Sequence, residues 1–133
     1  MAQVRIILRE DVHGLGLAGT VVSVRPGYAR LSMRVTADMI NSHGLCHGGM
    51  IFTLADEAFA YACNSHGHGA LAASAAIDFL APAHLGDVLE AEGIEQARAG
   101  RAGVYDIRVS RRDGGLVALF RGRSAAIRGK SAE

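Results

Sequence analysis

The stretch Asn41-Ser-His-Gly-Leu-Cys-His-Gly-Gly-Met-Ile-Phe-Thr-Leu-Ala-Asp-Glu-Ala-Phe-Ala-Tyr-Ala-Cys-Asn-Ser65 decides the fold. Residues 50–63 contain no Lys or Arg, and alanines alternate there with large apolar residues. This composition predicts a helix from about Gly49 to Ser65 that is buried on most of its sides.

Two carboxylates, Asp56 and Glu57, lie inside this apolar run. Ionised groups are costly to bury unless they are paired or used in chemistry. Because consecutive residues project about 100° apart around a helix, the two side chains face different surroundings. We therefore expect at most one of them to face a reacting group.

The rest of the chain is typical of β-strands. Residues 20–35 form two β-rich runs around the turn pair Pro26-Gly27, which predicts a hairpin. Four more strands are expected after the helix, and the short loops between them predict antiparallel neighbours, with Asp113-Gly114 as a strong hairpin signal. These strands are Leu71–Leu80, Val88–Ala97, Val104–Arg111 and Leu116–Ile127. The fold class is therefore α+β, with an antiparallel sheet that must wrap around one helix.

Length and composition are those of one ordinary globular domain. The 133 residues are 50% hydrophobic and 20% charged, with a formal net charge of +1, so we expect a single domain over residues 1–133. Segment 1–14 is ambiguous between strand and helix. No basic run interleaved with aromatics suggests nucleic-acid binding, and no segment suits a membrane span or a secretion signal. We expect a cytoplasmic protein with reduced thiols at Cys46 and Cys63.

Several short motifs at fixed spacings run through the chain: Asn41, His43-Gly44, Cys46-His47-Gly48-Gly49, Leu54-Ala55-Asp56, Ala62-Cys63-Asn64-Ser65, Ile77-Asp-Phe-Leu-Ala-Pro82 and Gly86-Asp87. Together they resemble the hotdog-fold acyl-CoA thioesterases, and among these the PaaI-like group of phenylacetate degradation. The similarity extends from about Leu15 to Ile127.

The resemblance implies a curved antiparallel sheet wrapped around one long central helix. It further implies a homodimer whose sheets join edge to edge, usually assembled into a homotetramer. The implied activity is hydrolysis of acyl-CoA thioesters, foremost aryl- or arylacetyl-CoA, with coenzyme A as part of the substrate and no other cofactor or metal. Medium-chain acyl-CoA hydrolysis and non-catalytic binding of acyl-CoA are the alternatives.

Thioester hydrolysis needs donors for the oxyanion and an activated water or nucleophile. Gly48 and Gly49 open a helix whose first N–H groups and dipole suit an oxyanion. Asp56 lies two turns further on, about 10 Å by helical rise, so it cannot reach a carbonyl held at its own helix start. The site should therefore be shared between subunits. The resemblance implies that Asn41 and Gly48, with His47 alongside, come from the partner, while Asp56 acts as general base or nucleophile.

Other substrate contacts are also expected from the resemblance. Arg98, Gly100 and Arg101 align with a loop that relatives use near the CoA phosphates, and guanidinium groups suit such an anion. The alternative for these three residues is a solvated turn.

The position at which many relatives carry a water-orienting Thr or Ser aligns with Ala72. We expect Ser74 to substitute, because residues two apart on a strand share a face. Phe79, like Phe52 and Phe59, is bulky enough for an aromatic pocket but fits a hydrophobic core equally well.

Rival functions are weaker. Gly14-Leu-Gly-Leu-Ala-Gly19 has the G-x-G-x-x-G spacing of dinucleotide-binding turns, but strand-like residues follow it where a helix is required. Residues 4–28 resemble the N-terminal segment of a bacterial large-subunit ribosomal protein, yet the charge balance does not suit RNA.

His43, Cys46 and His47 lack a fourth ligand and a rigid spacing for zinc. Cys46 and His47, as neighbours on an extended chain, point to opposite sides and do not form a nucleophile–base pair.

Overall fold

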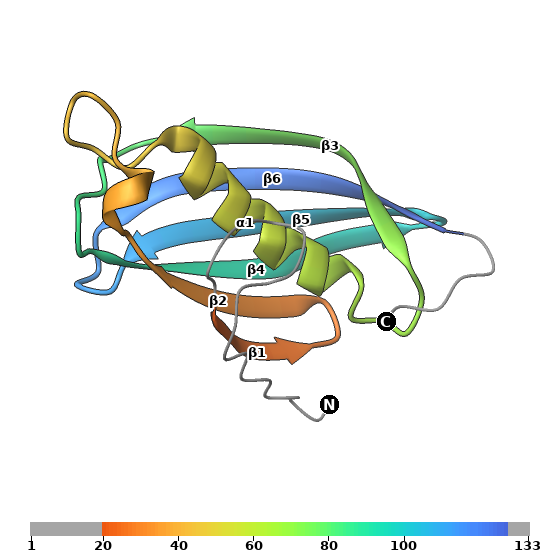
Figure 1. The fold of residues 1–133 in the computed structure, drawn as a ribbon. Coiled ribbons are helices and arrows are strands. Elements are labelled where there is room, and N and C mark those ends of the chain that lie inside the picture. The colour runs from red at the N-terminus through yellow and green to blue at the C-terminus, as the bar shows by residue number, and fades with distance from the viewer. Residues whose placement is uncertain (1–19, 128–133) are drawn as a thin grey trace.

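The computed structural model describes residues 20–127, in which six antiparallel strands curve around one long helix (Figure 1). The elements are β1 (Thr20–Arg25), β2 (Tyr28–Arg34), the 3-10 helix η1 (Ala37–Met39), α1 (Gly48–Cys63), β3 (Ala70–Phe79), β4 (Val88–Ala99), β5 (Ala102–Arg111) and β6 (Leu116–Ala126). The predicted α+β class, with two strands, a long helix and four more strands, is confirmed. The ambiguous segment 1–14 lies outside the described residues.

The strands pair in the order β1-β2-β4-β5-β6-β3. The predicted hairpins β1–β2, around Pro26-Gly27, and β5–β6, around Asp113-Gly114, are present. The expectation that all strands after the helix pair with their neighbours in sequence is wrong for β3 and β4, because β3 pairs with β6 and β4 pairs with β2. The connection between them crosses the end of the sheet, where Gly86 N–H donates to the Val35 carbonyl at 2.9 Å.

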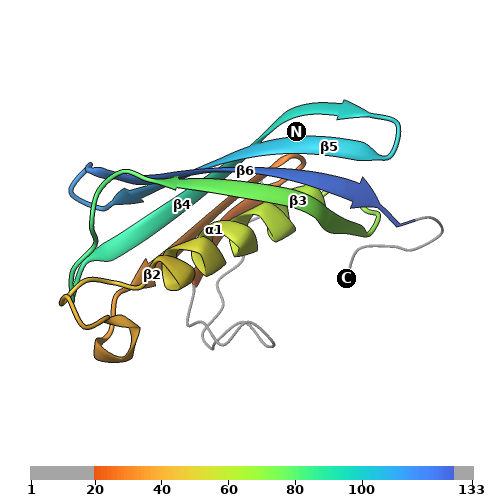
Figure 2. The ribbon, with the colours of Figure 1, turned by 90° about the horizontal axis from the view of Figure 1, so that it is seen from above.

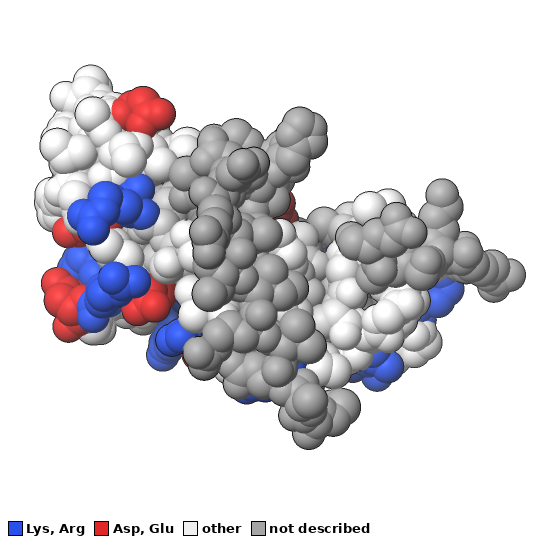
Figure 3. Space-filling model, turned by 60° about the horizontal axis from the view of Figure 1, so that its bottom comes forward, with Lys and Arg blue, Asp and Glu red and all other residues white. Residues whose placement is uncertain are grey.

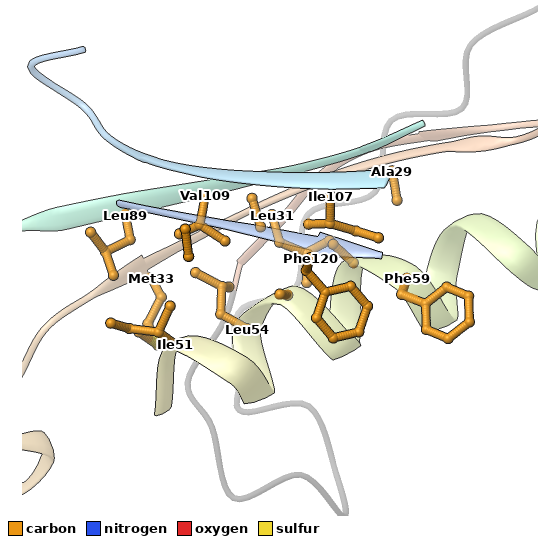
Figure 4. Packing of buried hydrophobic residues seen from close by; sticks show 14 of the residues in the cluster. Ala29, Leu31, Met33, Ile51, Leu54, Phe59, Leu89, Ile107, Val109 and Phe120 are labelled. Atoms are coloured by element: carbon orange, nitrogen blue, oxygen red, sulfur yellow. The ribbon is translucent and has the colours of Figure 1, made fainter. Parts of the chain in front are cut away.

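Helix α1 packs against the concave face of the sheet, as the two perpendicular views show (Figures 1 and 2). Leu54 and Phe59 of α1 are fully buried among apolar side chains from β2, β4, β5 and β6 (Figure 4). Gly122 of β6 is required by this contact, because a Cβ there would lie 2.7 Å from the Phe59 ring. The alternation of small and large residues along α1 thus fits a helix pressed closely onto a sheet.

The observed helix starts one residue before the predicted start and ends two residues before the predicted end. At its C-terminus, Asn64 Nδ2 donates to the Ala60 carbonyl at 2.9 Å and Ser65 Oγ donates to the Ala62 carbonyl at 2.6 Å. These side-chain bonds satisfy the last carbonyls of the helix and replace a further helical turn. Neither helix within residues 20–127 is long and apolar enough to cross a membrane.

Candidate functional site

The loop before α1 is organised by Asn41. Its side-chain Oδ1 accepts hydrogen bonds from the N–H groups of His43 at 2.9 Å and Leu45 at 3.1 Å, and its backbone N–H donates to the Leu45 carbonyl at 2.7 Å. Within residues 20–127 the amide Nδ2 of Asn41 has no hydrogen-bond partner. The oxygen therefore fixes the loop, and the nitrogen remains available as a donor.

The first turn of α1 leaves two donors free. The His47 carbonyl accepts hydrogen bonds from the N–H groups of Met50 at 3.0 Å and Ile51 at 3.3 Å. Gly48 and Gly49 precede these residues, and their own N–H groups have no acceptor in the described part of the chain. Both donors stand at the positive end of the helix dipole, where an oxyanion is stabilised.

A hollow of about 340 Å³ opens beside these donors and is lined by Asn41, Gly48, Phe79 and the apolar residues Leu45, Ile51, Leu80 and Pro82. A Cβ at Gly48 would lie 3.1 Å from the Phe79 ring, so the glycine lets the aromatic ring approach the helix start. Phe79 is itself 52% exposed. The structure thus brings together three predicted site residues around an apolar space with free donors.

Asp56 lies outside this hollow, two turns further along the helix and half-buried. Its carboxylate makes no hydrogen bond or ion pair with any residue in 20–127. Burial raises the pKa of this carboxyl group above its ordinary value, which makes the ionised form a stronger base. Asp56 therefore combines a raised pKa with a carboxylate that has no partner among residues 20–127.

Glu57 is the more deeply buried of the two carboxylates. It is fully buried, and neither of its oxygens has a hydrogen-bond partner among residues 20–127. Burial, with a smaller contribution from the charge of Asp56, raises its pKa to about 7. A neutral, protonated Glu57 is the form that suits such surroundings.

The other groups near the helix start are weak candidates for covalent chemistry. His47 is exposed and its side chain makes no capping hydrogen bond to the helix. Cys46 and Cys63 are free, buried thiols, as expected for reduced cysteines. Burial raises the pKa of both thiols, that of Cys63 to about 11, so neither provides a thiolate nucleophile near neutral pH.

Ser74 does not share a face with Ala72, and the reasoning that placed it there is wrong. Strand β3 carries an irregularity between these residues, so that Ala72 pairs with Ser124 whereas Ser74 pairs with Arg123. Ser124 is buried beneath the sheet and Arg123 is exposed on its outer face. A bulge of this kind reverses the alternation of side chains, which a count of residues along the sequence cannot detect.

Arg98, at the end of β4, and Gly100 and Arg101, on the β4–β5 turn, lie at the opposite end of α1 from Gly48. They line a smaller hollow of about 70 Å³ together with His66 and His68, which follow the helix. Neither histidine is among the predicted site residues, although both follow the predicted helix directly in the sequence. Glu95, which lies beside them, is not among the predicted site residues either.

The comparisons that cover most of the chain all point to one family. The model of the thioesterase superfamily matches residues 43–118. The acyl-coenzyme A thioesterase PaaI of Escherichia coli is 48% identical over 119 residues, covering 90% of this chain and 85% of that protein. The solved structure of E. coli PaaI, from the phenylacetic acid degradation operon, superposes with a TM-score of 0.84 at 46% identity, covering 86% of this chain and 83% of that one.

A more distant structural relative is a Streptococcus mutans protein solved with acetyl-CoA bound. It has a TM-score of 0.79 and 26% identity, covering 85% of this chain and 90% of that one. The hotdog fold and the resemblance inferred from the sequence motifs are thereby confirmed.

A second, local match concerns the N-terminal part. The model of the ribosomal protein L9 N-terminal domain matches residues 4–39, and protein bL9 of Thermodesulfovibrio yellowstonii is 62% identical over 26 residues, covering 20% of this chain and 18% of that protein. Within the described residues, β1 and β2 of this segment pair with each other, and β2 pairs with β4 of the single sheet. The described residues of this segment, 20–39, are therefore part of the same domain as the rest of the described chain.

Proposed function

The chain belongs to the thioesterase superfamily and is a thioester hydrolase, and from this premise we propose that it converts aryl- or arylacetyl-CoA, such as (hydroxy)phenylacetyl-CoA, to the free acid and coenzyme A. The observation that carries the proposal is the apolar hollow beside the free N–H groups of Gly48 and Gly49. The bulky, half-exposed ring of Phe79 in that hollow supports an aromatic acyl group.

Asp56 of a second subunit would complete the active site by adding a carboxylate to the hollow beside Gly48. The hollow has donors for an oxyanion but no carboxylate in its lining, whereas Asp56 has a carboxylate without partners. The helical rise separates the two within a protomer, so only a neighbouring copy can join them. Asn41 would contribute its free Nδ2 as a further donor to the thioester carbonyl.

Two routes are chemically complete with these groups. As a general base, ionised Asp56 removes a proton from water while the water oxygen attacks the thioester carbon. The glycine N–H groups hold the oxyanion that forms. The C–S bond then breaks to release the thiolate, which takes up a proton. As a nucleophile, an Asp56 oxygen attacks the same carbon, expels the thiolate and forms a mixed anhydride that water then hydrolyses. Both routes require the ionised carboxylate.

The edge strand β3 supports the pairing of two copies. Eight of its ten residues are exposed, and Leu71, Phe79 and the adjoining Leu80 are 63%, 52% and 54% exposed. An apolar strand with unpaired backbone groups on its outer side is a surface that another chain covers. We propose a homodimer formed along β3, and a homotetramer of two such dimers, in a cytoplasmic protein whose single domain spans residues 1–133.

A thiol-release assay tests the proposed activity. Phenylacetyl-CoA, its ring-hydroxylated relatives and medium-chain acyl-CoA thioesters are compared as substrates, and kcat/KM is measured for each. The proposal expects the highest value for the aromatic thioesters. A preference for medium-chain thioesters would overturn the acyl specificity, and binding of coenzyme A without any turnover would instead indicate an acyl-CoA-binding protein.

A further inference from the structure

Basic side chains line the hollow at the C-terminal end of α1, and within residues 20–127 they surround one acid. Arg98, Arg101, His66 and His68 line it, and the acidic side chain beside it is Glu95. Figure 3 shows basic side chains at the right-hand end of the molecule, the end at which the β4–β5 turn lies in Figure 1. A small concave site with this balance of charge favours an anion.

Glu95 fixes the orientation of His66. Its Oε1 accepts a hydrogen bond from the Tyr105 hydroxyl at 2.9 Å and lies 2.7 Å from His66 Nε2, while Arg98 Nε is 3.8 Å away. An ionised carboxylate can only accept hydrogen bonds, so Nε2 of His66 must be the donor. The second ring nitrogen, Nδ1, has no partner in the described part of the chain.

The charge on the His66 ring decides what its free nitrogen presents to the hollow. When the ring is neutral and Nε2 carries the hydrogen, Nδ1 presents a lone pair that repels an anion. When the ring is protonated, Nδ1 becomes a donor and the ring gains a positive charge. His68, whose ring stacks on that of His66 with centroids 6.1 Å apart, has no hydrogen-bond partner within residues 20–127 and gains a charge in the same way.

Arg101 is already oriented for such a ligand. Its Nε and Nη2 donate to the Ala126 carbonyl at 3.1 and 2.8 Å, which holds the guanidinium group at the edge of the hollow. The remaining titratable groups that face the hollow are Cys63 and Tyr105, and burial raises the pKa of each, so both stay neutral near pH 7.

We propose that His66 and His68 complete a binding site for a phosphate group of coenzyme A, so that protonation of the two histidines strengthens binding of the phosphate-bearing ligand. The inference rests on the proposed function and adds to it a dependence on pH that the arginines alone cannot give. Coenzyme A, dephospho-CoA and pantetheine share the thiol arm but differ in phosphates, and the structure assigns the effect to the phosphates only.

Isothermal titration calorimetry on the full chain tests this at pH 6 and pH 8. For the wild type, we expect coenzyme A to bind roughly five- to tenfold more tightly at pH 6, the effect of one or two partly screened charge-assisted hydrogen bonds. Pantetheine should show no such change. The 3′-phosphate of coenzyme A itself gains negative charge over this range, which favours binding to the arginines at pH 8. The variant with both His66→Gln and His68→Gln should therefore bind coenzyme A no more tightly at pH 6 than at pH 8, whereas His84→Gln, at an exposed site elsewhere, should behave as the wild type.

Dephospho-CoA decides which phosphate is bound. If it retains the pH effect, the diphosphate occupies the hollow; if it loses the effect, the 3′-phosphate does. An unchanged pH dependence in the double histidine variant, or an equal dependence for pantetheine, would overturn the inference. Because calorimetry measures binding without turnover, absence of thioester hydrolysis in the separate assay would overturn the proposed function while leaving this result interpretable.

Discussion

Asp56 and Glu57 are neighbours in sequence, but Asp56 is half-buried whereas Glu57 is fully buried. We therefore predict that substitution of Asp56 lowers activity strongly and that substitution of Glu57 does not. We expect Asp56→Asn to lower kcat by about 10²- to 10⁴-fold, because the amide keeps the volume of the side chain but removes its basicity and nucleophilicity. Circular dichroism and coenzyme A binding should remain close to wild type. Kinetics with phenylacetyl-CoA provide the measurement.

Glu57→Gln is the matched control for Asp56→Asn, since it makes the same chemical change one residue further along the same helix. It should retain most of the activity. Near-normal turnover in Asp56→Asn would remove Asp56 from the mechanism, and unfolding of that variant would show instead that the carboxylate has a structural role.

Glu57 should make the stability of the protein dependent on pH. Its pKa is about 7 in the folded state and 4.5 for an ordinary glutamate, so between these values the folded state holds a proton that the unfolded state has lost. The free energy of unfolding therefore falls as pH rises from 4.5 to 7, by about 3 kcal/mol at most, and this contribution is constant above pH 7.

Urea unfolding at pH 5 and pH 8, at one protein concentration, measures this effect. Glutamine cannot ionise, so Glu57→Gln should lose less stability than the wild type between the two pH values. The comparison uses the change with pH within each protein, because the buried amide that this substitution introduces itself lowers stability by an amount that does not vary with pH. Parallel losses in the two proteins would contradict a raised pKa for Glu57.

The start of α1 depends on two glycines that differ in their surroundings. A Cβ at Gly48 would press on the Phe79 ring at 3.1 Å, whereas a Cβ at Gly49 would meet nothing within 4 Å. We expect Gly48→Ala to move the ring into the apolar hollow and to lower kcat/KM by roughly tenfold or more, since small misplacements at a reacting centre are costly. Gly49→Ala should have a smaller effect. Equal effects of the two substitutions on kcat/KM would argue against a role for the ring contact.

The helix and the hairpins could be predicted because their signals are local. The run from Met50 to Cys63 and the turn pairs Pro26-Gly27 and Asp113-Gly114 each lie within one short segment of sequence. The pairing of β3 with β6 and the reversal of Ser74 could not be predicted, because both depend on register between strands distant in sequence. The contact of His66 with Glu95 likewise joins a loop to a strand 29 residues away.

The free N–H groups at the start of α1 and the Asp56 carboxylate lie at separate places on the chain, so the proposed mechanism requires an assembly that brings them together. The exposed β3 edge provides the surface on which this occurs in the proposed dimer. A two-fold axis along that edge would create two equivalent sites, each with Asp56 from one subunit and Asn41 and Gly48 from the other. The activity would then be a property of the dimer and absent from the monomer.

Hybrid dimers provide the sharpest measurement of a shared site. Asn41→Asp keeps the Oδ1 acceptor that holds the loop but removes the free Nδ2 donor, so this variant and Asp56→Asn should each be nearly inactive alone. In a dimer with one subunit of each kind, one site combines both changes and the other is entirely wild type. Co-expression with random pairing should therefore restore about a quarter of the wild-type activity per subunit. If each site is built within one subunit, mixing the two variants restores no activity.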